Sequence, residues 1–156
     1  KIDWDMIKTN IDKISRLVLD MLQYSKERKP ELKPENVNRI IEEVIVLENE
    51  GMKKRSIEIR KNLSADLPKI LLETKSIFRC FLNLISNSID ALENSEKGVI
   101  TITSKKDKSH LIIEIKDNGC GISVENQKKL FTKFFSTKGA KGTGFGLPIT
   151  KKIIEE

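Results

Sequence analysis

The stretch 74–92 constrains the fold more than any other part of the chain, because it carries two side-chain stripes at helical spacing. The first stripe is apolar and consists of Phe78, Leu82, Ile85, Ile89 and Leu92. The second stripe is polar and consists of Asn83, Asn87 and Asp90. This spacing predicts a long amphipathic helix that buries its apolar face against another layer of the fold.

Short apolar runs elsewhere predict the layer that this helix covers. Strands are expected where apolar and polar residues alternate or where a short apolar run is bounded by turn residues, at 57–60, 70–72, 99–103 and 111–115. A second amphipathic helix is expected over 35–55. Together these elements predict an α+β fold, a two-layer α/β sandwich with a mixed sheet and helices on one face.

A long helix is predicted to precede this domain, over about the first 28 residues. Its apolar side chains alternate in steps of three and four: Trp4, Ile7, Ile11, Ile14, Val18 and Met21. A helical hairpin or bundle would cover this stripe, and so would packing on the chain's own domain. Lys29-Pro30 and Lys33-Pro34 then form a connector. We therefore divide the chain into a helical arm at 1–29 and a domain at 30–156.

Composition excludes several classes of protein. The net charge is +6, but the 29 basic residues are interleaved with 23 acidic ones, and aromatics make up only 5% of the chain, which argues against nucleic-acid binding. No apolar run reaches membrane-spanning length and the N-terminus lacks a secretory profile, so no membrane contact is expected. Cys80 and Cys120 can form neither a disulfide framework nor a zinc site by themselves, and a reducing, cytoplasmic setting is expected.

The polar stripe of the 74–92 helix is the first candidate site. Asparagine and aspartate are poor helix formers, and a plain exposed face would favour Glu, Lys or Gln at these positions. Carboxamide oxygens suit a Mg²⁺ ion that already carries phosphate oxygens and waters. The alternative is a solvated helix face without a site.

A second cluster follows the strand at 111–115 and runs from Asp117 to Ile122. A carboxylate at the end of a strand, followed by Gly119 and Gly121, can accept a hydrogen bond from an exocyclic amine and admit a purine. The alternative is an ordinary glycine-rich turn. Cys120 is expected to be a small filler, because no histidine lies near it in the sequence.

The third cluster, at 139–146, holds four glycines in eight positions, with Lys138 and Lys141 beside them. Free backbone amides and ammonium groups suit a polyphosphate. Pro148 then fits the first turn of a helix. The alternative is a flexible connector, since the segment lacks the spacing of a Walker loop.

The clusters occur in a specific order, which strongly resembles the N, G1, F and G2 boxes of the sensor histidine kinase catalytic domain. The matching sequences are Asn83-Leu-Ile-Ser-Asn87-Ser-Ile-Asp90-Ala91, Asp117-Asn-Gly119-Cys-Gly121, Phe131-Thr-Lys-Phe134-Phe135 and Gly142-Thr-Gly144-Phe-Gly146-Leu147. The resemblance covers about residues 30–156, and the arm resembles the second helix of that family's dimerisation and phosphoacceptor hairpin. It implies the ATP-binding fold shared with gyrase B subunits, heat-shock chaperones and mismatch-repair ATPases.

The resemblance implies roles for single residues, with ATP and Mg²⁺ as cofactors. Asn87 is assigned to Mg²⁺ and Asn83 to the metal or phosphate neighbourhood, while Asp117 is assigned to the adenine amine. The close turn beneath the base holds Gly119, Gly121 and Ile122. Asp90 stands where the family pattern varies, and its contact is left open.

The same resemblance assigns a mobile lid near the phosphates. Its candidate residues are Phe135, Thr137, Lys138, Gly142, Thr143, Gly144, Phe145, Gly146 and Leu147. Thr137 and Lys138 would reach phosphate oxygens, whereas Phe131, Phe134 and Phe135 would form either a hinge or part of a core. The candidate catalytic residues are Asn83 and Lys138.

Asn83 bears on whether the reaction is hydrolysis or phosphoryl transfer. Hydrolytic members of the superfamily generally carry a glutamate where Asn83 stands, and an amide cannot accept a proton from water. The resemblance therefore favours phosphoryl transfer to histidine. A hydrolytic ATPase or serine kinase of the same fold, and a nucleotide-responsive interaction module without catalytic output, remain as alternatives.

The expected partners also follow from the resemblance. They are ATP, a second copy of the chain bound through the arm, and the receiver domain of a response regulator. The single histidine, His110, follows a lysine-rich turn and is expected to be exposed, not an acceptor. The acceptor helix and the family's final strands are expected to be missing, so the chain is expected to be truncated.

Overall fold

The computed structural model describes residues 4–25, 30–139 and 142–156. The chain forms two compact units. One consists of the described residues of 1–29 and 123–156, and the other consists of residues 30–122.

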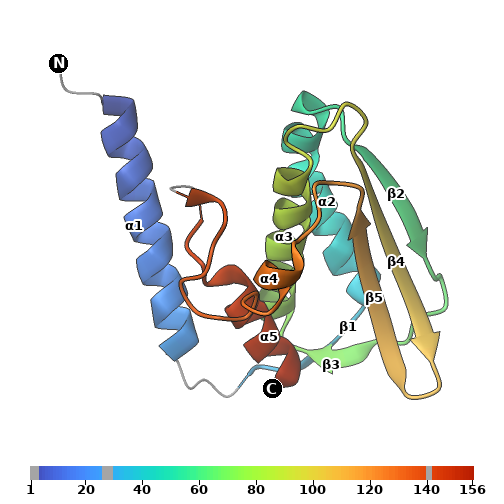
Figure 1. Ribbon diagram of the computed structural model, residues 1–156. Helices are drawn as coiled ribbons and strands as arrows, with labels where there is room; N and C mark the ends of the chain where they lie inside the picture. Colours follow the sequence, from blue (N-terminus) through green and yellow to red (C-terminus); the bar gives the residue numbers. More distant parts are fainter. Residues whose placement is uncertain (1–3, 26–29, 140–141) are drawn as a thin grey trace. The chain divides into compact units, whose positions relative to one another are not determined.

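The unit 30–122 is built on a mixed three-stranded sheet with β4 at its centre (Figure 1). Strand β2 (Glu58–Leu63) runs parallel to β4 (Val99–Asp107), and β5 (His110–Asp117) runs antiparallel to it. The register places Ile100 opposite Asp117, so β5 ends beside the start of β4.

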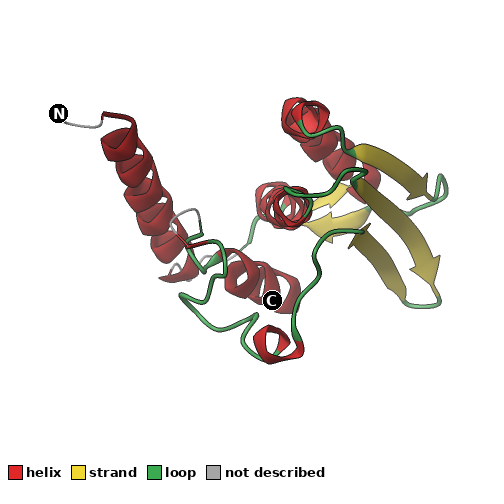
Figure 2. Ribbon diagram, turned by 45° about the horizontal axis from the view of Figure 1, so that its top comes forward, coloured by secondary structure: helices red, strands yellow, loops and turns green. Residues whose placement is uncertain are grey.

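Two helices, α2 (Val37–Lys54) and α3 (Thr74–Ala91), cover one face of this sheet (Figure 2). Alternate residues of β4 turn toward them, and Ile100 and Ile102 are completely buried. The core between helices and sheet is aliphatic, with Ile40, Ile41, Val44, Ile85, Ile89 and Leu92 among its members. The predicted fold class is confirmed.

A second, two-stranded sheet pairs β1 (Lys33–Glu35) with β3 (Ile70–Leu72) in antiparallel register. We expected a connector at Lys33-Pro34, and that expectation is wrong for this stretch. Pro34 is compatible with a strand here because the strand lies at an edge, where a missing N–H costs little.

The ends of two elements differ from the sequence-based ranges for local reasons. Helix α2 begins at Val37 because Asn36 caps it, with its Oδ1 accepting a hydrogen bond from the Asn38 N–H at 2.9 Å. Strand β4 extends to Asp107 because antiparallel pairing with β5 continues to the hairpin, where Asp107 opposes His110.

The other unit contains α1 (Trp4–Ser25), the short helix α4 (Val124–Gln127) and α5 (Gly146–Glu155). Residues 26–28, where we placed the end of the first helix, lie outside the described residues. The apolar stripe of α1 is exposed, and it includes Trp4, Ile7, Ile11, Ile14, Val18, Met21 and Leu22. Among the described residues, no helix combines the length and the apolar character needed to cross a bilayer.

Candidate functional site

The polar stripe of α3 lies where the sequence placed it. Asn83, Asn87 and Asp90 are all half-buried on this helix. The opposite stripe differs in part from the prediction, because Phe78 and Leu82 are only half-buried while Cys80, Phe81 and Ser88 are buried. Helix α3 packs against both α2 and β5, so its buried face is wider than a single apolar stripe.

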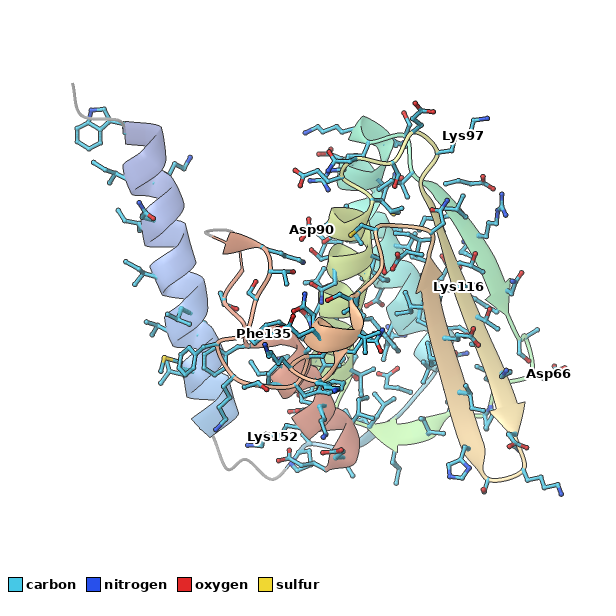
Figure 3. The ribbon with its side chains drawn as sticks, viewed as in Figure 1. Asp66, Asp90, Lys97, Lys116, Phe135 and Lys152 are labelled. Atoms are coloured by element: carbon cyan, nitrogen blue, oxygen red, sulfur yellow. The ribbon has the colours of Figure 1, made fainter. Side chains whose placement is uncertain are left out.

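Asp90 has a protein partner in this structure. Its Oδ1 lies 3.6 Å from Nη1 of Arg55, the residue at the end of α2. The same Nη1 donates a hydrogen bond to the carbonyl of Ile89 at 3.0 Å. Arg55 therefore contacts the last turn of α3 through a charge and through the Ile89 carbonyl, which also accepts a hydrogen bond from the Leu92 N–H at 3.3 Å. Figure 3 labels Asp90 on this helix.

Asp117 ends β5 and begins a tight turn, which we call the Asp117 turn (residues 117–121). Its Oδ1 accepts a hydrogen bond from the Gly119 N–H at 2.9 Å, the arrangement of an Asx turn. This bond fixes the orientation of the half-buried carboxylate. A carboxylate has two oxygens and can accept further hydrogen bonds beside this one.

The Asp117 turn is docked on the carboxyl end of α3. The Cys120 N–H donates to the carbonyl of Ala91 at 3.1 Å. A Cβ on Gly119 would lie 2.5 Å from that same carbonyl oxygen, so only glycine fits. Gly121 has a φ of +67°, a left-handed conformation that also favours glycine. The turn is therefore held against the end of the helix that carries the first cluster.

Two residues of this turn differ from expectation or were missed. Cys120 is exposed and does not fill the interior, so its expected role as a filler is wrong. Asn118 was given no role, yet its side chain makes two short hydrogen bonds to the backbone at Lys97 and Val99. The sequence signal for this role was an asparagine directly after the aspartate that ends the strand. Asparagine is also common in ordinary turns, so this signal did not single out Asn118. Ile122 is half exposed, at 50%.

The third cluster belongs to the other unit, in a segment that we call the lid (residues 131–147). Phe131 and Phe134 are exposed, Phe135 is half-buried and Phe145 is buried. The rings of Phe134 and Phe145 meet edge to face with centroids 4.8 Å apart. The three phenylalanines expected to act alike therefore differ, because Phe131 and Phe134 are exposed and Phe135 is half-buried. Figure 3 labels Phe135.

The two halves of the lid are joined by a backbone contact. The Phe134 N–H donates to the carbonyl of Gly144 at 3.1 Å. Gly144 has a φ of +71°, and a Cβ there would overlap the backbone of Phe134. Phe134 itself has a φ of +64°, which is unusual and costly for a bulky residue. The predicted F and G2 boxes therefore form one folded segment.

The remaining candidate residues of the lid form local turns. Lys138 is half-buried and its N–H donates to Ser136 Oγ at 3.1 Å, while Thr137 is exposed. Thr143 Oγ1 accepts from the Phe145 N–H at 3.4 Å.

The lid leads directly into α5. Gly146 begins this helix, and Leu147 is half-buried. Pro148 stands in its first turn, as predicted. A Cβ on Gly142 would overlap Ser136 Oγ, so a larger residue there would require that side chain to move. Lys141, expected beside the phosphates, lies outside the described residues.

Charges around α3 are unevenly placed. Burial raises the pKa of Glu48 on α2, and the negative charge of Asp90 raises it further.

Over the described parts of the chain, no group of three or more His, Cys, Asp or Glu side chains could hold a metal ion. A cation here would need ligands beyond such side chains, such as amide and phosphate oxygens. His110 is exposed at the tip of the β4–β5 hairpin, as expected.

The chain is similar to known proteins in both sequence and structure. Residues 73–156 match the family described as histidine kinase-, DNA gyrase B-, and HSP90-like ATPase. The signal transduction histidine-protein kinase AtoS of Escherichia coli (strain K12) is 32% identical over 150 residues, which are 96% of this chain and 24% of AtoS. The chain likewise spans only 35% and 20% of the next two curated relatives.

Two solved structures of the histidine kinase ThkA are similar to this chain. Its nucleotide-free catalytic domain aligns with a TM-score of 0.70 and 34% identity, covering 80% of each chain. ThkA in complex with the response regulator protein TrrA aligns with a TM-score of 0.80 and 30% identity, covering 97% of this chain and 42% of that one.

Proposed function

Because the chain belongs to the family of histidine kinase-, DNA gyrase B-, and HSP90-like ATPases, we propose that it is the ATP-binding catalytic module of a sensor histidine kinase. The module binds Mg-ATP and transfers the γ-phosphoryl group to a histidine on a hairpin helix. The observation that carries the proposal is the docking of the Asp117 turn on the end of α3, where Ala91 contacts Gly119 and Cys120. This contact holds the turn that carries the Asp117 carboxylate against the helix that carries Asn83 and Asn87, which supports the proposal.

Asp117 reads the base in this proposal. Its carboxylate accepts a hydrogen bond from the exocyclic amine of adenine, with its orientation already fixed by the Gly119 N–H. Such preorganisation lowers the entropy cost of binding. Gly119 and Gly121 provide a turn without side chains beneath the base, and Ile122 offers an apolar side chain beside it.

Asn87 binds Mg²⁺, and Asn83 lies in the metal or phosphate neighbourhood. The described residues fit this role through their chemistry, because neutral amide oxygens suit an ion whose remaining ligands are phosphate oxygens and waters. When bound, the cation neutralises charge that develops on the phosphates. Asn83 cannot act as a general base toward water, which favours transfer over hydrolysis.

The lid holds the phosphates. Thr137 and Lys138 supply a hydroxyl and a charge, and the backbone N–H groups near Gly142, Gly144 and Gly146 supply donors without side chains in the way. Lys138 stabilises charge on the transferred group, which makes it a candidate catalytic residue with Asn83. Thr143, Phe145 and Leu147 shape the segment around these donors, and Phe135 borders it.

Partners follow from the exposed arm and from the relatives. The exposed apolar stripe of α1 pairs with a second copy in a helical bundle. The complex of ThkA with TrrA supports a response regulator receiver domain as a further partner. The module works in the cytoplasm, on nucleotide available there.

Calorimetric titration of the chain with Mg-ATP tests binding. We expect saturable heat in the wild type and at least a tenfold weaker affinity for Asp117→Asn, which removes the acceptor charge. Asn62→Asp, an exposed change on β2, is the matched control and should retain wild-type affinity. A folded wild-type chain that produces no heat would overturn the proposal.

Labelled ATP tests the reaction. With a separately supplied hairpin that carries the family's acceptor histidine, we expect acid-labile phosphate on the hairpin and little free phosphate. Steady phosphate release without labelled protein would instead identify a hydrolytic ATPase.

A further inference from the structure

The pairing between β4 and β5 ends in an unusual way. Thr101 opposes Lys116 and Ile100 opposes Asp117, so the next pair along the strands is Val99 with Asn118. In an antiparallel ladder such a pair exchanges two backbone hydrogen bonds. Here the Asn118 N–H donates to the Val99 carbonyl at 3.3 Å, but the Val99 N–H donates to the side-chain Oδ1 of Asn118, at 2.7 Å. A side chain has replaced the backbone carbonyl in the last rung.

The other half of the same amide is also engaged. Nδ2 of Asn118 donates to the carbonyl of Lys97 at 2.9 Å. One side chain therefore binds the backbone on both sides of Gly98, just where β4 begins. Lys97 is labelled in Figure 3 at this end of the sheet. Gly98 is itself fixed, since its carbonyl accepts from the Glu58 N–H of β2 at 2.8 Å.

This substitution frees the main chain after Asp117. Because the Asn118 carbonyl takes no part in the rung, the backbone can leave the sheet one residue earlier and turn at Gly119 toward Ala91. The Asx bond from Gly119 to Asp117 depends on that turn. The amide of Asn118 and the carbonyl of Ala91 thus hold the turn from two sides.

We propose that Asn118 is a positioning residue for purine recognition, which sets the place where β5 ends and so holds the Asp117 carboxylate. This inference rests on the proposed function, because it assumes that Asp117 reads adenine. The position requires both a donor and an acceptor. An aspartate would keep the acceptor for Val99 but would put a carboxylate oxygen against the Lys97 carbonyl.

The test compares two nucleotides that differ at the group Asp117 reads. Inosine triphosphate has a carbonyl in place of the exocyclic amine of adenine. Calorimetric affinities for Mg-ATP and Mg-ITP are measured for the wild type, Asn118→Asp, Asn118→Ala and the control Asn62→Asp. Melting temperatures are recorded for each, and Asn118→Asp decides the matter if Asn118→Ala does not fold.

We expect the wild-type preference for ATP over ITP to fall about tenfold in both Asn118 variants, as for the loss of one well-placed hydrogen bond, and to persist in the control. A merely structural role would weaken both nucleotides alike and leave the ratio unchanged, and that result overturns the inference. A wild type that binds neither nucleotide overturns the proposed function itself. The two failures are therefore distinguishable.

Discussion

The Asp117 turn and the lid both contain several glycines but are held in different ways. The Asp117 turn is fixed from outside, by Ala91 on α3 and by the backbone of Lys97 and Val99 at the start of β4. Three bonds in the lid instead join its own residues: Phe134 with Gly144, Ser136 with Lys138, and Thr143 with Phe145.

The difference teaches that glycine content alone does not define a mobile loop. Gly119 is required because another element lies against it, whereas Gly144 is required by its backbone conformation and by its own loop. A turn fixed from outside can hold a rigid base at a constant position. A segment with bonds between its own residues can move as a body, and the proposed phosphate role of the lid requires such movement.

The largest effect is expected for Gly119→Ala. The added Cβ would lie 2.5 Å from the Ala91 carbonyl oxygen, and neither α3 nor the turn can easily move away. We expect a loss of about 3 kcal/mol in the free energy of unfolding, measured with urea, and loss of ATP binding. Gly51→Ala is the control, since its nearest neighbour lies 3.8 Å away within α2, and it should stabilise by about 0.5 to 1 kcal/mol. Near-wild-type stability of Gly119→Ala would show that the turn is not rigid.

A smaller effect is expected for Gly144→Ala in the lid. Its left-handed backbone costs about 1 to 2 kcal/mol for alanine, and the lid can relieve part of the overlap with Phe134 by a local change of its own conformation. The affinity for ATP should fall more than the affinity for adenosine, because only ATP has phosphates for the lid to hold. Gly121→Ala, with the same backbone conformation and open space around it, should cost about 1 kcal/mol. Equal losses for ATP and adenosine in Gly144→Ala would contradict a phosphate role for the lid.

Arg55→Gln tests the outside support of α3. Removing the guanidinium breaks its bond to the Ile89 carbonyl and its pair with Asp90, at a cost of about 1 kcal/mol. Asp90→Asn should cost less, and the double variant should lose less than the sum of the single ones, because the partners are shared. We also expect Asp90→Asn to keep ATP affinity within about twofold, since its carboxylate faces Arg55. A large loss of affinity would return Asp90 to the nucleotide contacts.

The smallest effect concerns Glu48. Burial and the charge of Asp90 raise its pKa in the folded chain, so the folded state binds a proton more tightly than the unfolded state does. Stability from this group is therefore lost as the pH rises from the ordinary glutamate pKa through the raised value. Glu48→Gln should raise the melting temperature slightly at pH 7, and the gain should vanish below about pH 4. Glu50→Gln, at an exposed position of α2, is the control for removing a glutamate charge from this helix.

Local patterns in the sequence predicted most of the fold. Helices α2 and α3 and strands β2 to β5 form where spacing and alternation placed them, because a stripe of apolar residues determines which face must be buried. The misses include β1 and the buried Phe81, Cys80 and Ser88 on α3. Both depend on a neighbour in space, the partner strand β3 in one case and the joint packing of α2 and β5 in the other.

The candidate residues were found because their types suit phosphate, metal and purine, and because their order resembles a known family. The resemblance could not give Asp90 a partner or Asn118 a role. The partner of Asp90 comes from the end of α2, and the bonds of Asn118 reach the start of β4. Both contacts join residues that are far apart in the sequence, so a local sequence pattern could not predict them.

The sequence by itself determined which residues carry the chemistry: the asparagines of α3, the aspartate at the end of β5 and the glycines that keep backbone accessible. It did so because residue type fixes which groups can donate, accept or coordinate. Only the tertiary structure decided how the Asp117 turn is held, through Ala91 on one side and the amide of Asn118 on the other. The reason is that hydrogen bonds and close contacts depend on distances in space, which chain folding sets between residues far apart in sequence.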